Sequence, residues 1–353
     1  MSLESIQIDT EKIGSGEKIF NFLDKIGFNE IKKTDKNFNE WINNLSYEDF
    51  LDYITRLNGI IREKPLNKRM IDGKGVEISC LMGIIYLPPY AEQKNELMIE
   101  GFNAIKEIKS NEDRATLAYY LIQSIHPYSD GNGRTGRLLY ELIINNQIDK
   151  NTLSEIIDHE NSSNYCTGKG RDIFYKKLLP PNKAYYLINR EVVKEFLEED
   201  FLKKNGGIYF SAPLGSGWLS EETKNKLSKE EVDLSEKILG EGDTYTFPFR
   251  GIVLAKLIEE NNSLNKYIYK NDKKIEIGKY LALSEDFGKN ILNIDDKIMD
   301  DLNEKQVRRL IEIHKELKEK FVKTLIDIFK NPEQHKEESL EGNKSYIKDD
   351  FNF

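Results

Sequence analysis

The sequence predicts a mainly α protein with one short β-hairpin. Apolar residues recur at intervals of three and four along most of the chain, whereas strict alternation is confined to a short stretch around residues 76–86. Proline and glycine mark the turns between these segments. The length of 353 residues favours about two domains, and 39% hydrophobic with 32% charged residues is typical of a folded globular protein.

Composition excludes several classes of protein. A formal net charge of −9 argues against a chain that coats nucleic acid, and no nucleic-acid partner is expected. Cys80 and Cys166 form no CxxC pair, so neither a disulfide framework nor a zinc site is predicted. The first sixteen residues lack the pattern of a secretory signal, and no apolar run is long enough to span a membrane. We expect a cytoplasmic protein, or an effector exported without an N-terminal signal peptide.

The first half of the chain alternates helices with turns. Residues 1–45 are predicted as an N-terminal extension, and a helix begins near Ser46. Residues 76–86 then predict the hairpin, which ends at two prolines, and residues 91–108 an amphipathic helix. Ser110 and Asp113 resemble a capping box. They open a helix that must stop at the rim marked by His126, because Pro127 disfavours helical geometry at the residue before it.

The second half predicts a different region. Residues 46–181 are assigned to one domain, and residues 182–353 to a mostly helical accessory region with a role in target recognition. Its clearest element is a long helix from Asp300 to about Pro332, with apolar residues along one side.

The stretch SIHPYSDGNGRTGRLL, residues 124–139, concentrates the potential chemistry. A glycine-rich turn that opens a helix directs its N–H groups toward one point, which favours an anion such as phosphate. Gly131 and Gly133 allow close approach of phosphate oxygens, Asn132 adds a side-chain donor, and Arg134 and Arg137 can clamp further phosphates.

Two other groups complete this loop. A carboxylate beside bound phosphates is reasonable chiefly as a ligand of Mg²⁺, and Asp130 occupies that position. His126 is the nearby group whose ordinary pKa suits proton abstraction near neutral pH. It could deprotonate a hydroxyl that attacks phosphorus.

Residues 126–137, HPYSDGNGRTGR, resemble the signature of the Fic family, HxFx(D/E)GNGRxxR, with Tyr128 in the place of phenylalanine. The resemblance covers roughly residues 45–175 and implies a Fic fold, a helical bundle with a β-hairpin flap. It implies transfer of AMP from ATP, with Mg²⁺, to a Ser, Thr or Tyr hydroxyl of a target protein.

The roles that the resemblance implies follow the motif. His126 would be the general base and Asp130 the magnesium ligand, while Gly131, Asn132, Gly133, Arg134 and Arg137 would bind the nucleotide. The flap at Gly83, Ile84, Ile85 and Tyr86 would pair with an extended segment of the target.

Alternatives remain at this stage. Relatives of this family transfer UMP, phosphate or phosphocholine, and a nucleotide-binding scaffold without transferase activity is a further hypothesis. The inhibitory pattern [ST]xxxE[GN] of many Fic proteins does not occur, so inhibition by a separate antitoxin chain is open, as for a bacterial toxin. His159, His314 and His335 lack companions at ligand spacing, which favours solvated or packed roles.

Overall fold

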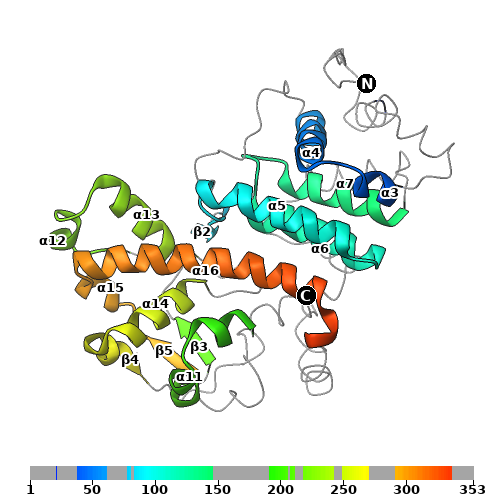
Figure 1. Cartoon of the computed structure of the whole chain (residues 1–353). Coiled ribbons are helices and arrows are strands. Elements are labelled where there is room, and N and C mark those ends of the chain that lie inside the picture. Colours follow the sequence, from blue (N-terminus) through cyan, green and yellow to red (C-terminus); the bar gives the residue numbers. More distant parts are fainter. Residues whose placement is uncertain are drawn as a thin grey trace, which may run out of the picture. The chain divides into compact units, whose positions relative to one another are not determined.

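The computed structural model describes residues 21, 38–61, 78–80, 83–145, 191–205, 207–210, 218–241, 249–269 and 291–335. These residues are mostly helical, which confirms the predicted fold class. They fall into two compact units (Figure 1). The first unit holds the described residues up to 61 and from 90 to 145. The second holds the hairpin with residues 87–89, together with the described residues from 191 onward.

Helices build the first unit. They are α3 (Phe38–Asn43), α4 (Tyr47–Ile61), α5 (Ala91–Glu107), α6 (Asn111–Ile125) and α7 (Asn132–Asn145). Helix α6 packs against both α5 and α7, and α3 and α4 pack against α7. Figure 1 shows α5 and α6 running side by side. The apolar faces of α6 and α7 form a core that includes Leu117, Leu121, Ile122, Leu138, Leu139 and Leu142.

The ends of α6 lie where the sequence predicted them. The Ser110 hydroxyl accepts the Asp113 N–H at 3.3 Å, which is one of the two bonds of a capping box. At the other end His126 is the C-cap. The following helix, α7, begins at Asn132, within the glycine-rich segment itself.

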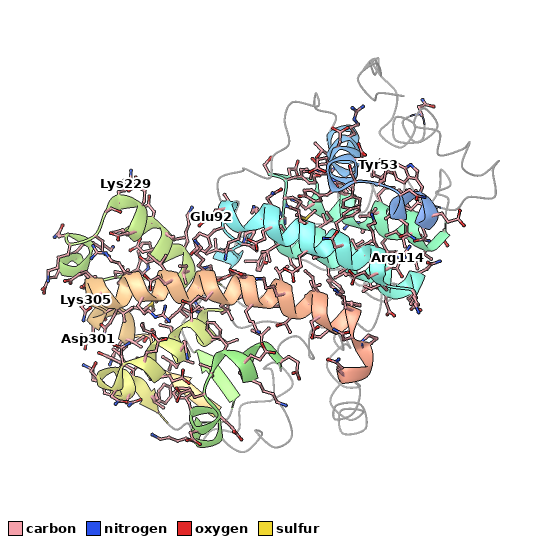
Figure 2. The ribbon with its side chains drawn as sticks, in the orientation of Figure 1. Tyr53, Glu92, Arg114, Lys229, Asp301 and Lys305 are labelled. Atoms are coloured by element: carbon pink, nitrogen blue, oxygen red, sulfur yellow. The ribbon has the colours of Figure 1, made fainter. Side chains whose placement is uncertain are left out.

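Helix α3 belongs to the first unit, although the sequence analysis left residues 38–43 in an N-terminal extension. The Asn39 amide donates to the Ile143 carbonyl at 3.0 Å, and its oxygen accepts from the Arg114 guanidinium at 3.2 Å. Arg114, labelled in Figure 2, also donates to the Ile108 carbonyl at 2.7 Å. One buried guanidinium therefore links α3 to the turn that precedes α6.

The second unit combines helices with two small sheets. Strands β1 (Ile78–Cys80) and β2 (Gly83–Tyr86) form the predicted antiparallel hairpin. Strand β5 (Ile291–Ile294) pairs in parallel with β3 (Gly207–Phe210) and antiparallel with β4 (Ile268–Tyr269). The sequence analysis missed this second sheet because its strands are only two to four residues long. The helical elements are α11 (Glu199–Asn205), α12 (Glu221–Lys224), α13 (Lys229–Leu239), α14 (Phe249–Glu260), η3 (Asn262–Tyr267), α15 (Ile298–Asp301), α16 (Glu304–Lys330) and η6 (Pro332–His335).

Helix α16 is the long helix that the sequence predicted, and it packs against α13 and α14 (Figure 1). It begins at Glu304, four residues later than predicted, because the Asn303 side chain accepts the Gln306 N–H as an N-cap. None of the described helices is both long and apolar enough to cross a bilayer.

We predict that Arg114→Met lowers the free energy of unfolding by about 2–3 kcal/mol, because the Ile108 carbonyl and the Asn39 oxygen lose a buried charged donor. The control is Arg56→Met, whose guanidinium pairs with Asp52 one turn away, and this change should cost under about 1 kcal/mol. Chemical denaturation measures both. Equal losses would show that the Arg114 network contributes no more than a partly buried ion pair within one helix.

Candidate functional site

The loop between α6 and α7 begins with a backbone conformation that few residues adopt. His126 has φ 51° and ψ 61°, in the left-handed region, and its N–H donates to the Ile122 carbonyl. Among the described residues it is the one non-glycine residue with positive φ. Such strain persists only where surrounding contacts hold it, and it is concentrated at functional sites. The predicted position of His126 at the rim of the helix is confirmed.

The side chain of Asn132 closes the loop from within. Its oxygen accepts the Tyr128 N–H at 3.0 Å, and its amide donates to the Tyr128 carbonyl at 2.7 Å. Asn132 is buried, with 1% of its surface exposed. The sequence analysis expected this side chain to be a donor to phosphate. In the structure the side chain binds the loop backbone, with one of its two N–H donors, and its predicted donation to phosphate stays a prediction.

Helix α4 supports the loop from a second side. The Asn58 amide donates to the Asp130 carbonyl at 2.8 Å and to the Thr135 hydroxyl at 3.2 Å. The buried hydroxyl of Tyr128 lies 3.1 Å from the Thr55 hydroxyl. That contact accounts for tyrosine where the family signature has phenylalanine, because the extra oxygen has a partner. Asn58 and Thr55 carried no signal in the sequence beyond their place on a helix near the motif.

Lys94 on α5 is a further residue that the sequence analysis missed. Its ammonium donates to the His126 carbonyl at 3.0 Å, although only 1% of the residue is exposed. Burial lowers the pKa of Lys94 to about 8. A buried lysine on the apolar side of an amphipathic helix is rare, and that anomaly was the available signal.

The imidazole of His126 is buried and neutral near pH 7. Burial, and secondly the charge of Lys94, lower its pKa from 6.5 to about 4, while a hydrogen bond to the Gln123 backbone and the charge of Asp130 oppose the shift. Its Nδ1 atom has no hydrogen-bond partner among the residues that the structure describes. A buried ring nitrogen without a hydrogen-bond partner can accept or donate a proton when a substrate binds beside it.

The remaining motif residues lie at the start of α7. The Asp130 carboxylate accepts the Gly131 N–H at 2.7 Å and lies 3.5 Å from the Arg134 guanidinium. Gly131 has φ 77°, which requires glycine. Arg134 and Arg137 are partly buried and lie three residues apart on the helix. Carboxylate, glycine turn and arginines are thus together on one helix N-terminus, where a helix favours anions.

Gly136, also within the motif, has a packing role. A Cβ atom there would lie 3.0 Å from the ring of Tyr119 on α6. The glycine therefore allows α7 to approach α6 closely, and this approach sets the spacing of the loop between them.

The predicted flap lies in the other compact unit. Strand β2 consists of Gly83, Ile84, Ile85 and Tyr86. It belongs to the same compact unit as the C-terminal residues. The side chain of Tyr86 is buried against Phe249, with ring centroids 5.5 Å apart. His314 is packed, as one of the two alternatives predicted, whereas His159 and the side chain of His335 lie outside the described residues.

We predict that Lys94→Met raises the pKa of His126 above its value of about 4, because the positive charge of Lys94 is removed, while burial, the larger cause, keeps the pKa below 6.5. Proton NMR of the four histidines between pH 3.5 and 8 measures this shift. Lys106→Met is the control, since Lys106 lies on the same helix but binds the Leu45 carbonyl. A His126 that titrates near 6.5 in the wild type would contradict the described environment.

Comparison with known proteins agrees with the geometry. Residues 33–144 match the model of the Fic/DOC family, a range that includes α3 and the whole loop. No solved structure matches the chain at a significant level. Over residues 33–144, about a third of the chain, this protein is therefore similar to the Fic/DOC family.

Proposed function

We propose that this protein is a protein adenylyltransferase, which moves AMP from ATP to a hydroxyl of a target protein. Members of the Fic/DOC family are commonly transferases of this or a related kind. The observation that carries the proposal is the single loop that holds a strained, buried His126 at the end of one helix and a glycine turn with two arginines at the start of the next.

His126 is the proposed general base. Its pKa of about 4 keeps the ring neutral, and therefore able to accept a proton, at any pH above that value. The negative charges of a bound triphosphate would raise the pKa toward neutrality and make the ring a stronger base. The left-handed backbone and the bond from Lys94 to the His126 carbonyl fix where the ring can stand.

The start of α7 is the proposed nucleotide site. Gly133 lies in the first turn of a 14-residue helix, where backbone N–H groups have no partner within the helix, and Arg134 and Arg137 supply positive charge. Gly131 precedes this turn, and its N–H donates to the Asp130 carboxylate. The donor set also fits Mg²⁺. Asp130 is half-exposed, and one carboxylate together with substrate phosphates is the usual way that proteins hold this ion. When bound, Mg²⁺ would supply charge neutralisation at the phosphates.

The chemical step that we propose is an in-line displacement. The acceptor oxygen forms a bond to the α-phosphorus as the bond from that phosphorus to the bridging oxygen breaks, and pyrophosphate leaves. The acceptor proton passes to the imidazole of His126. AMP remains on the acceptor as a phosphodiester, so a protein with an exposed Ser, Thr or Tyr is the partner required. Since the inhibitory pattern of the family does not occur in the sequence, a separate inhibitory chain is included among the proposed partners.

Transfer of UMP or of phosphate would use the same base, and isotope labelling distinguishes these reactions from adenylyl transfer. We predict that label from the α-phosphate of ATP, but none from the γ-phosphate, will appear on protein acceptors in bacterial or animal-cell lysates. His126→Asn should lower the rate by about 10²–10⁴, the usual contribution of a general base. Asparagine tolerates left-handed geometry, so this variant keeps the loop shape.

Three outcomes would contradict adenylyl transfer. Label from the γ-phosphate alone indicates a kinase-like reaction, and label from UTP alone indicates uridylyl transfer. A thermal shift with ATP and Mg²⁺, with no adduct on any protein by intact mass, indicates a nucleotide-binding scaffold.

We predict that Asp130→Asn raises the Mg²⁺ concentration for half-maximal transfer by at least about tenfold, because even outer-shell partners of metal ligands cost that much. Glu112→Gln, which removes an exposed carboxylate on α6, is the matched control and should leave the requirement unchanged. Titration of the rate with Mg²⁺ at saturating ATP measures both. The same half-maximal concentration in both variants would remove Asp130 from the metal site.

A further inference from the structure

A buried cluster of charges in the second unit contacts the chain where it leaves the flap. The Leu87 N–H, directly after β2, donates to Glu241 Oε1 at 2.8 Å. Glu241 Oε2 lies 3.0 Å from His314 Nε2, and Lys318 also binds Oε1. The side chains of Glu241 and Lys318 are wholly buried, and that of His314 is 1% exposed.

The position of Glu241 is fixed from two elements. It follows the C-cap of α13 directly, and its N–H donates to the Ile238 carbonyl. His314 and Lys318 lie one turn apart on α16, so both side chains reach the same carboxylate. Burial alone would raise the pKa of Glu241, but Lys318 and His314 lower it below its ordinary value. The carboxylate is therefore charged when it accepts the Leu87 N–H.

Aromatic side chains enclose the same group. The Lys318 ammonium lies 4.1 Å from the ring centroid of Tyr86 and 3.2 Å from that of Phe249. Phe249 in turn contacts Phe321 of α16 at 5.3 Å. The side chain of Tyr86, the last residue of β2, thus packs against Phe249 and Lys318. The backbone of the next residue, Leu87, is held by Glu241.

Stability alone does not explain such a cluster. An apolar replacement of a buried ion pair is often neutral or stabilising, whereas a charged acceptor fixes one donor in one place. The Leu87 N–H is the last backbone donor before Pro88 and Pro89, which have none. A two-stranded hairpin is marginal by itself, so its position depends on what holds its ends.

We propose that the C-terminal part of the second unit, its described residues from 191 onward, positions the flap through the buried carboxylate of Glu241. Glu241 is thereby a positioning residue for the acceptor segment of the target. The inference rests on the proposed function, in which that segment pairs with β2. No other strand pairs with β2 beyond β1 in the part of the chain that the structure describes, so β2 retains an edge for the acceptor. The unit that would recognise the target would then also hold the strand that receives it.

Two double variants of the full chain test the bond from Leu87. Glu241→Gln with Lys318→Met removes both charges but keeps an oxygen that can accept the Leu87 N–H. Glu241→Met with Lys318→Met removes the charges and the acceptor together. Hydrogen exchange of the Leu87 amide should be about tenfold faster or more in the second variant than in the first. His314→Met removes the partner of Oε2 and leaves Oε1 and Lys318 in place, so the Leu87 exchange rate should remain that of the wild type.

A second readout separates positioning from folding. With the acceptor protein isolated by α-labelled ATP, the methionine double variant should raise the KM for the acceptor about tenfold. The KM for ATP and kcat should stay within about twofold of the glutamine double variant. If the role of Glu241 were purely structural, its loss would also lower kcat and destabilise α16. Hydrogen exchange of the amides of residues 304–330 measures the stability of this helix.

The outcomes are distinguishable. Equal Leu87 exchange in the two double variants overturns the anchor. Unprotected exchange of the Leu87 amide in the wild type overturns it as well, and this measurement does not depend on whether the methionine variant folds. A changed exchange rate with an unchanged KM for the acceptor overturns the positioning role. If the wild type transfers no label, the proposed function fails, and the exchange comparison by itself decides whether Glu241 holds the flap.

Discussion

Two hydrogen bonds between the Asn132 side chain and the backbone of Tyr128 hold the loop on which the candidate site depends. They join the chain before the glycine turn to the first residue of α7, so the end of one helix and the start of the next form one rigid bend. Because the amide is buried, loss of either bond would leave a polar group unsatisfied. His126 and the arginines are placed through this bend.

The bend also brings opposite electrostatic requirements close together. An anion site needs positive charge, and a general base needs to be free of its proton. Lys94 serves the second need, because its charge favours the neutral imidazole, and its ammonium also fixes the His126 carbonyl. The cost is a desolvated lysine, whose own pKa falls to about 8. A buried cation next to a strained residue is a combination that function explains better than stability does.

The sequence predicted what depends on local pattern. Helical periodicity located α4 to α7 and α16, alternation located the hairpin, and the spacing of the motif placed His126 on a helix rim. It did not predict contacts between residues far apart in the chain. Lys94, Asn58 and Glu241 act on partners 32, 72 and 154 positions away, and nothing local marks such pairs. It also did not predict that Asn132 holds the loop, because an amide can bind its own backbone as readily as a ligand.

The interleaved course of the chain has a consequence for biosynthesis. A ribosome completes the helices that carry the motif well before it reaches Glu241, 154 residues beyond Leu87, and α16 comes later still. During that interval the hairpin exists without the carboxylate that holds its end. A nascent or prematurely terminated chain would therefore contain His126 but not the carboxylate that holds the end of the hairpin, and the hairpin would be anchored only after Glu241 and α16 have been made.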